Sequence, residues 1–271
     1  MKKIILSSLF FSICCTCAAQ DSLAFSIGSN SFSKGNAQDA IYWFSKSIEK
    51  NYLPADSYMY RGASSAYIGA YDEALRDLFY SYKLDSTISL TCEFIGNVYL
   101  AQNKLDSSII WLTKAIKIDP KDADAYNNKA VAYKAQKDFD KAMAAVESAI
   151  SCCPKNRSYI LNRAAIKQEQ LNYEGALEDY NMTLAIDPML EKNIMTYVNM
   201  AICHASLNSM DEALADVDKI LTRYPNTGEA LEARGQLYQA MGRKDEACSD
   251  FEKLNAIDST VGKDCLDKYC R

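Results

Sequence analysis

Ten cysteines and one histidine are the side chains that could support redox, metal or nucleophilic chemistry in this sequence. Three cysteines lie before residue 20, and the seven that follow are Cys92, Cys152, Cys153, Cys203, Cys248, Cys265 and Cys270. In an oxidising compartment some of the seven should form disulfides. Because seven is an odd number, at least one of them cannot pair within the chain.

The spacing of these residues does not indicate catalysis or metal binding. His204 has no serine or cysteine at a spacing that fixes a nucleophile beside it, so a partly buried structural histidine is favoured. Cys152-Cys153 has no second cysteine pair at zinc-like spacing. We therefore predict no catalytic residue, no metal, no cofactor and no enzymatic activity.

Composition and charge favour an ordered chain that does not bind nucleic acid. With 49% hydrophobic residues, 10 glycines and 5 prolines in 271 residues, disorder is not expected. The formal charge is −5, and no basic stripe is visible. Phosphate binding needs such a stripe, so a nucleic-acid partner is disfavoured.

Residues 1–19 have the layout of a secretory signal peptide. Lys2 and Lys3 precede an apolar run from Ile4 to Cys17, which is too short for an integral membrane span, and Ala19 fits the small-residue cleavage rule. We therefore predict export, to the periplasm or as a secreted protein. A lipoprotein is less favoured, because none of Cys14, Cys15 and Cys17 follows the usual leucine and small-residue run.

The stretch from Ala123 to Pro154 has the pattern of two amphipathic helices joined by a polar turn at Lys137-Asp138. The apolar residues at steps of three or four are Tyr126, Ala130 and Tyr133 in the first helix, and Phe139, Ala142, Val146 and Ala149 in the second. A single helical hairpin cannot bury these faces alone. The pattern therefore predicts neighbours of the same kind.

Copies of this hairpin recur along the chain, mostly at intervals of 34 residues. A small residue marks the second helix of each copy: Ala40, Ala74, Ser108, Ala142, Ala176, Ala213 and Ala247. Bulk at this position would push the paired helices apart. The predicted repeats lie near residues 21–54, 55–88, 89–122, 123–156, 157–190, 194–227 and 228–261, with three extra residues before the sixth and a C-terminal cap at 262–271. We predict an all-α solenoid.

Within each repeat, specific residue types return at fixed positions. They are an aromatic residue at four (Tyr58, Tyr126, Tyr197), glycine or alanine at eight (Gly62, Gly96, Ala130, Ala164, Ala201, Gly235), tyrosine at eleven (Tyr99, Tyr133, Tyr238), alanine at twenty and proline at thirty-two (Pro120, Pro154, Pro188, Pro225). In these features the chain resembles the tetratricopeptide repeat. Ser65, Lys167 and His204 depart from the pattern at position eleven.

The resemblance implies a right-handed superhelix of antiparallel helix pairs, whose first helices line a concave groove for a peptide or a partner's helix. It implies no chemistry. The groove-facing positions of the family are two, five, nine, twelve and thirteen of each first helix, and they give these candidate partner-binding residues: Met59, Tyr67, Glu93, Asn97, Asn127, Val131, Lys134, Leu161, Gln168, Val198, Ile202, Glu232 and Gln236. The alternative is that these are solvated helix faces.

The candidate set combines amides, which can hydrogen-bond a peptide main chain, with an apolar floor. The subclass of the family that clamps carboxylates carries lysine at position five, and no repeat of this chain does. A partner with an uncharged or basic segment is therefore favoured.

Cys248 lies on the second helix of the last repeat, and Cys265 and Cys270 lie at the predicted cap. A disulfide from Cys248 to Cys270, or to Cys265, would close a loop of about 20 residues and stabilise this end by roughly 3 kcal/mol. The alternative is small buried thiols.

Together these patterns predict an exported, non-enzymatic scaffold or adaptor that binds a protein or peptide in the groove. The alternative, favoured by the odd cysteine number, is a structural or self-assembling envelope component. Homo-oligomerisation stays open, and an enzyme is the least favoured class.

Overall fold

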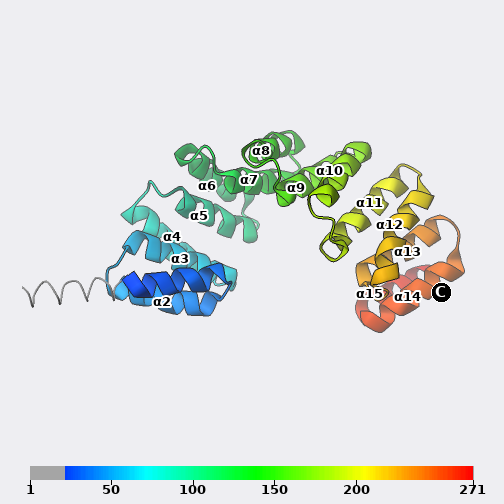
Figure 1. The fold of residues 1–271 in the computed structure, drawn as a ribbon, viewed down its shortest axis with the longest axis horizontal. Helices are drawn as coiled ribbons and strands as arrows, with labels where there is room; N and C mark the ends of the chain where they lie inside the picture. Colours follow the sequence, from blue (N-terminus) through cyan, green and yellow to red (C-terminus); the bar gives the residue numbers. More distant parts are fainter. Residues whose placement is uncertain (1–21, 271) are drawn as a thin grey trace, which may run out of the picture. The chain divides into compact units, whose positions relative to one another are not determined.

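The computed structural model describes residues 22–270, so the predicted signal peptide lies outside the described residues. Within that range every regular element is a helix, as the all-α prediction requires (Figure 1). No helix of the described part is both long and apolar enough to cross a bilayer. The helices fall into two compact parts that meet between Cys152 and Cys153. We call them the N-terminal body and the C-terminal body and describe each by itself.

The N-terminal body contains four helix pairs. They are residues 22–33 with α2 (Ala37–Glu49), α3 (Pro54–Tyr67) with α4 (Tyr71–Leu84), α5 (Ser89–Ala101) with α6 (Leu105–Ile118), and α7 (Ala123–Ala135) with α8 (Phe139–Cys152). Each of α2, α4 and α6 also packs against the first helix of the following repeat. The pairs therefore stack in chain order, as expected for a solenoid.

The C-terminal body contains three helix pairs and a final helix. The pairs are α9 (Arg157–Glu169) with α10 (Tyr173–Ile186), α11 (Ile194–Ser206) with α12 (Met210–Arg223), and α13 (Gly228–Ala240) with α14 (Lys244–Ile257). The final helix, α15 (Ser259–Tyr269), packs on α14. In this body α11 also contacts α13 directly, which places two first helices side by side.

The small residues at the second-helix marker lie at the close contact within each pair, and this prediction is confirmed. All seven, six alanines and Ser108, are fully buried. Position eight on the facing helix is equally restricted: a Cβ added to Gly235 would lie 2.4 Å from Cε1 of Phe251. Small residues on both helices therefore set the spacing within the pair.

The turn inside each repeat uses one residue in the left-handed conformation. Its φ is positive at Gly35, Gly69, Asn103, Lys137, Leu171, Asn208 and Gly242, which occupy the same position in all seven repeats. Glycine takes this conformation without strain, whereas lysine and leucine do so at a cost of roughly 1 kcal/mol. The repeat geometry, and not the residue type, therefore dictates this turn.

The three extra residues before the sixth repeat form an ordered connection. Residues Leu190–Asn193 are the 3₁₀ helix η1, and Asn193 is fully buried. Its amide nitrogen donates to the carbonyl oxygens of Asp187 and Met189 at 2.6 and 2.8 Å. The guanidinium of Arg157 on α9 donates to Asn193 Oδ1 at 2.7 Å. The insertion is therefore fixed against the preceding repeat and is more than a lengthened loop.

The C-terminal cap begins three residues before its predicted start at 262. Asp258 accepts hydrogen bonds from the backbone nitrogens of Thr260 and Val261, and this side-chain cap starts α15 at Ser259. Gly262 lets α15 approach α14, since a Cβ there would lie 2.2 Å from Cα of Asn255. The predicted start of the cap at residue 262 is therefore too late, and the cap helix begins at Ser259.

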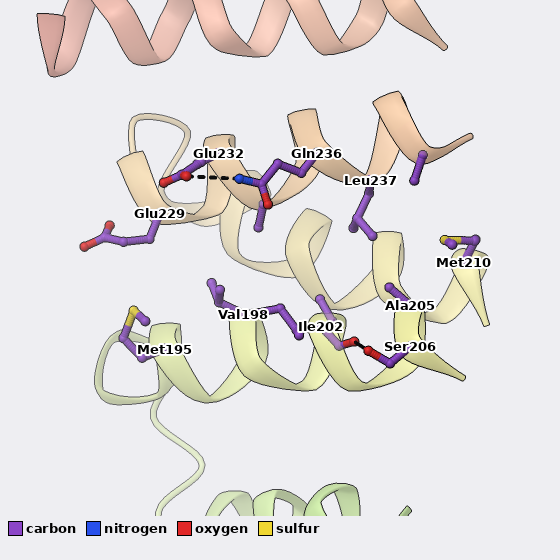
Figure 2. A pocket seen from close by; sticks show the side chains of 13 residues that line it. Met195, Val198, Ile202, Ala205, Ser206, Met210, Glu229, Glu232, Gln236 and Leu237 are labelled. Carbon is purple, nitrogen blue, oxygen red and sulfur yellow. Dashed lines mark hydrogen bonds between the residues drawn. The ribbon is translucent and has the colours of Figure 1, made fainter. Parts of the chain in front are cut away.

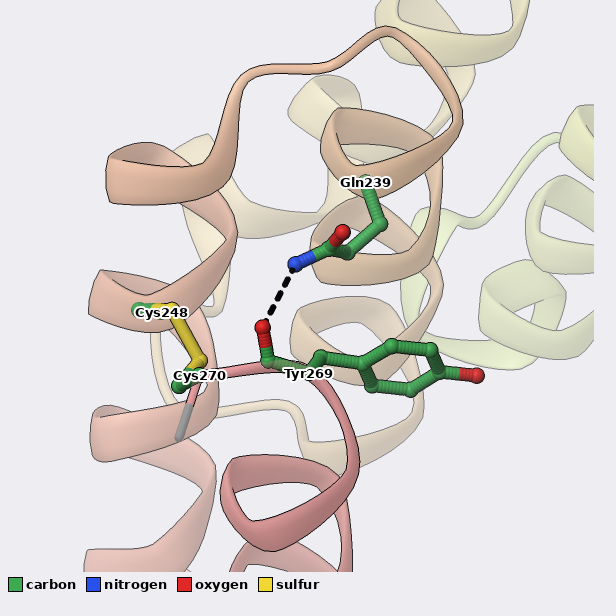
Figure 3. Close-up of a disulfide and its surroundings, with 4 residues drawn as sticks. All are labelled: Gln239, Cys248, Tyr269 and Cys270. Carbon is green, nitrogen blue, oxygen red and sulfur yellow. Dashed lines mark hydrogen bonds between the residues drawn. A yellow bond between two sulfur atoms is a disulfide. The ribbon is translucent and has the colours of Figure 1, made fainter.

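A disulfide between Cys248 and Cys270 ties the end of α15 to α14 (Figure 3). Gln239 on α13 donates to the carbonyl oxygen of Tyr269 at 3.2 Å, so the end of the cap is also held by the last first helix. Cys265, the other predicted partner, is a buried free thiol.

Ion pairs that the sequence analysis did not identify join first and second helices within repeats. Arginine at position seven forms a bidentate pair with aspartate at position twenty-three in three repeats: Arg61 with Asp77, Arg163 with Asp179, and Arg234 with Asp250. In each pair the two residues are 16 apart in the sequence. Their side chains are half-buried or buried, so they are stronger ties than surface pairs.

The same aspartate position explains two departures from the family pattern. Lys167 and His204 replace the tyrosine at position eleven, and each reaches the position-twenty-three aspartate of its own repeat. Lys167 Nζ lies 2.9 Å from Asp179, and His204 Nδ1 lies 2.8 Å from Asp216. The departures are therefore compensated by charge.

Candidate binding groove

An open, mainly apolar groove of about 560 Å³ lies between α11 and α13 (Figure 2). Its apolar lining is Met195, Val198, Ala201, Ile202 and Ala205 from α11, Met210 from the start of α12, and Ala233, Leu237 and Ala240 from α13. We call it the α11–α13 groove. Its volume is in the range of sites that bind ligands or anchor side chains in proteins.

The sequence of α11 explains why one helix can both pack and line a groove. Tyr197, Met200 and Cys203 are buried in the core of the body. Met195, Val198 and Ile202 follow one another at steps of three and four, so they form a second apolar stripe. Ile202 remains 44% exposed although it is a large apolar residue. Val198 is buried and belongs to the core, so the exposed part of this stripe is Met195 and Ile202.

The charged groups gather at one end of the groove, whereas Ser206, whose hydroxyl donates to the carbonyl oxygen of Ile202 at 2.8 Å, lies at the other end. Glu229 and Glu232 lie on the first two turns of α13, and Gln236 donates from Nε2 to Glu232 Oε1 at 3.0 Å (Figure 2). Glu229 makes no hydrogen bond or ion pair within residues 22–270. None of the lining residues is basic. The groove therefore has an acidic end and an apolar end.

The structure brings four of the sequence-predicted residues together in this groove: Val198, Ile202, Glu232 and Gln236. Two others lie on α9 of the same body. Leu161 is half-buried against the core. Gln168 accepts a hydrogen bond from the Tyr180 hydroxyl at 2.9 Å and lines a smaller hollow that also contains Ile202.

In the N-terminal body, the predicted groove residues on α5 and α7 form a polar network with each other. Asn97 Nδ2 donates to Glu93 Oε1 at 3.1 Å, and Asn128 Nδ2 donates to Asn97 Oδ1 at 2.9 Å. Asn127 joins the network through Asn128 at 3.4 Å. Glu93 and Asn127 are buried, so their prediction as open groove residues is wrong. Amides from adjacent first helices reach across and cover the carboxyl group.

Burial changes the acidity of the network's one carboxyl group. Desolvation, followed by repulsion from Asp122, raises the pKa of Glu93 from its ordinary 4.5 to about 7, while the Asn97 hydrogen bond acts in the opposite direction. Glu93 is therefore poised to change protonation near neutral pH.

The remaining predicted residues of the N-terminal body have mixed placements. Met59 is buried in the core with Leu78 and Ile95, so its prediction as a groove residue is wrong. Tyr67 is highly exposed and lines a small hollow together with Asn97. Val131 and Lys134 on α7 are half-buried.

The side chains suited to chemistry do not assemble into a reactive site within residues 22–270. The His204 ring is hydrogen-bonded to a carboxylate, and among these residues no hydroxyl or thiol is hydrogen-bonded to it. The described part contains no group of three side chains that could hold a metal ion. Burial raises the pKa of the Cys92 and Cys203 thiols to about 11, which disfavours the nucleophilic thiolate.

Sequence reasoning missed several residues of the groove. Met195 and Glu229 occupy position two of the sixth and seventh repeats, one of the positions that the family resemblance assigns to the groove. That position was the signal that could have identified them. Leu237 lies outside the family's groove positions, and its place in the lining follows from the approach of α11 and α13.

The fold and groove define a class of helical-repeat protein, and comparison with known proteins agrees with it. Family models described as tetratricopeptide repeats match residues 96–137, 123–156 and 228–260. These segments of the chain therefore carry tetratricopeptide repeats.

Related proteins and structures agree with this assignment. A DnaJ homolog subfamily C member 7 homolog from Dictyostelium discoideum is 32% identical over 91 residues, which are 33% of this chain and 17% of that protein's length. A tetratricopeptide repeat protein from Parabacteroides merdae superposes with a TM-score of 0.68 at 17% identity, covering 91% of this chain and 97% of that one. The type IV pilus biogenesis factor PilW gives 0.72 at 13% identity, covering 78% and 96%. At such identities the structural likeness concerns the fold.

Proposed function

We propose that this protein is a non-enzymatic adaptor that binds a segment of a partner protein in the α11–α13 groove. The observation that carries the proposal is the open apolar groove, most of whose lining residues occupy the repeat positions that the family uses for binding. Tetratricopeptide repeats bind protein partners as a class, and this groove offers exposed apolar surface, at Met195 and Ile202, to such a partner.

The lining suits a side-chain anchor from a peptide or helix. Val198, Ile202 and Leu237 offer apolar contacts, while Met195 and Met210 have flexible side chains that adapt to different shapes. Gln236 is exposed and offers an amide for a partner's main chain. A protein segment therefore fits better than a reacting substrate, for which the groove supplies no nucleophile or base paired to one.

We also propose that the protein works outside the reducing cytoplasm. The signal-like segment at residues 1–19 and the disulfide from Cys248 to Cys270 support this, since disulfides persist in oxidising compartments. Fractionation of cells expressing the full chain tests it, because a protein retained in the cytoplasm with reduced Cys248 contradicts export.

The test of partner binding compares two lysine substitutions at equally exposed isoleucines. Ile202 lines the groove and is 44% exposed, whereas Ile186 at the end of α10 is 40% exposed and does not line the groove. A charge at either position is solvated, so both variants should fold, with unchanged circular dichroism. Only a charge at position 202 should prevent an apolar anchor from entering the groove.

The measurement is quantitative mass spectrometry of proteins cross-linked to each variant in the cell. We expect the same partner with the wild type and with Ile186→Lys, and loss of that partner with Ile202→Lys. Equal recovery from both variants contradicts the proposed function.

A self-assembling component remains the second candidate because of the thiols at the end of α8. Cys152 and Cys153 are exposed and free, so they are accessible to a second copy of the chain. Size measurement with and without reductant decides this alternative. A dimer that disappears on reduction and in the Cys152→Ser/Cys153→Ser variant supports self-assembly, and a monomer under both conditions excludes it.

A further inference from the structure

Resting on the proposed function, we infer that the α11–α13 groove selects a partner segment in which lysine or arginine lies beside an apolar anchor. The basic residue binds at the Glu229 and Glu232 end, and the anchor lies toward Leu237 and Met210. The groove thus fixes both the chemistry of the segment and its direction.

The charge argument comes from the two carboxylates. Glu229 and Glu232 are three residues apart on α13, so they lie on adjacent turns of one helix face and border the same end of the groove (Figure 2). Within residues 22–270, Glu229 is unpaired, and Glu232 accepts a hydrogen bond only from the neutral amide of Gln236. A basic side chain from a partner would therefore supply the missing opposite charge.

The charge of the whole body acts in the same direction. Residues 153–271 contain 14 lysine and arginine residues against 19 aspartate and glutamate residues, a formal charge of −5. Such an excess attracts a basic segment and repels an acidic one during encounter. An acidic partner segment is thus disfavoured both at a distance and in contact.

The two carboxylates differ in their position along α13, and so in how far the helix dipole accounts for their negative charge. Glu229 lies in the first turn, where the helix dipole already favours a negative charge. Glu232 lies beyond that turn, so the dipole does not explain it. The change at Glu232 is therefore the more informative of the two substitutions.

The length of the groove limits the size of the recognised segment. From Glu229 to Ala240, α13 rises about 16 Å at 1.5 Å per residue, which matches roughly three helical turns or five extended residues of a partner. A segment of that length can place one basic residue at the acidic end and one apolar anchor against Ile202 and Leu237.

The experiment uses three synthetic twelve-residue peptides of identical leucine and alanine content, which carry two lysines, two glutamines or two glutamates at one end. Their binding is followed by the ¹³C-methyl signals of Met195 and Met210, which Met195→Leu and Met210→Leu variants assign. Met195 lies at the acidic end of the groove and Met210 at the opposite end (Figure 2).

We expect the lysine peptide to bind about fivefold more tightly than the glutamine peptide, and the glutamate peptide to bind most weakly. In Glu229→Gln/Glu232→Gln, the lysine peptide should bind no better than the glutamine peptide. The matched control Glu174→Gln/Glu178→Gln removes two exposed carboxylates of α10 from the same body and should keep most of the preference. A spin label on the basic end should broaden Met195 more than Met210.

Equal affinity for the three peptides overturns the inference. So does a preference for the lysine peptide that survives in Glu229→Gln/Glu232→Gln. The inference also fails if about millimolar lysine peptide shifts neither methionine methyl signal. The proposed function is judged separately. If Ile202→Lys abolishes partner capture while the charge preference is absent, the adaptor function stands and only the basic-segment inference fails. If Ile202→Lys has no effect, the proposed function fails.

Discussion

The two bodies use the same repeat positions for different chemistry. At position twenty-three, the C-terminal body has aspartate in every repeat, and each aspartate is joined to a cation or imidazole of its first helix: Asp179, Asp216 and Asp250. The N-terminal body has Trp43, Asp77, Trp111 and Ala145 at this position. Trp111 packs edge-on against Phe79 and Tyr82. Position twenty-three therefore carries either an ion pair to the first helix of its own repeat or, at Trp111, aromatic packing on α4 of the preceding repeat.

The first-helix faces differ in a way that bears on function. On α5, Glu93 and Asn97 at positions five and nine are engaged with amides of α7. On α11, the same positions carry Val198 and Ile202, which line an open groove. Polar residues that can reach one another close the face of α5 and α7, whereas on α11 Val198 is buried and the exposed side chain of Ile202 leaves the face open. For this reason we assign partner binding to the C-terminal body.

The largest expected effect comes from removing a shared carboxylate. Asp179→Ala leaves both Arg163 and Lys167 without their buried counter-charge, so the C-terminal body should lose about 4 kcal/mol of unfolding free energy. Urea unfolding followed by circular dichroism measures the loss.

The matched change in the other body is Asp77→Ala, where one arginine loses its partner. It should cost less, about 2 kcal/mol, and should be visible by tryptophan fluorescence because both tryptophans, Trp43 and Trp111, lie in the N-terminal body. Equal losses for the two variants would show that the second cation on Asp179 adds nothing.

Within residues 22–270, the one disulfide lies at the end of the C-terminal body. Cys270→Ser opens the loop closed with Cys248, 22 residues apart, and should lower unfolding free energy by about 3 kcal/mol. The circular-dichroism transition should shift to lower urea, while the tryptophan transition stays in place if the bodies unfold separately. Cys153→Ser, at an exposed free thiol, is the control and should change neither transition.

The next effect concerns Glu93, the buried carboxyl group in the polar network of α5 and α7. Because folding raises the pKa of Glu93 from 4.5 to about 7, the folded state binds more protons than the unfolded state between these values. The contribution of protonated Glu93 to the unfolding free energy is therefore fully present below pH 4.5 and is lost as the pH rises toward 7. The loss amounts to up to about 3 kcal/mol. Glu93→Gln should remove this dependence, measured by tryptophan-detected urea unfolding at pH 5 and pH 8.

The control is Glu232→Gln, at the same repeat position beside the open groove. Its side chain is half-exposed, so the substitution should change stability by less than about 0.5 kcal/mol at either pH. A pH dependence that persists in Glu93→Gln would contradict the network as its source.

Much of the fold could be predicted from the sequence because packing positions repeat. The buried small residue of each second helix and the position-eight glycines are local steric requirements, so Ala142 and Gly235 reveal their roles without a structure. The ion pairs were missed because a spacing of 16 residues is not a helical period. The departures Lys167 and His204 were visible, but only their contact with a position-twenty-three aspartate explains them.

The candidate site could be predicted only in part, because a repeat position fixes a direction and not the degree of burial. Met59 and Glu93 occupy groove positions, yet adjacent helices cover them. At position nine, Ala63 is buried whereas Ile202 remains 44% exposed. The difference depends on which side chains of the next repeat reach across, and that is not encoded in a single repeat.

The most direct test of the central claim places a photo-crosslinking amino acid at equivalent positions of the two faces. Ile202 and Val131 both occupy position nine of their repeats, on α11 and α7. On irradiation in cells, we predict a cross-linked partner from position 202 and none from position 131 or from the control position 186 on α10. A partner captured from position 131 but not from position 202 would contradict the assignment of binding to the α11–α13 groove.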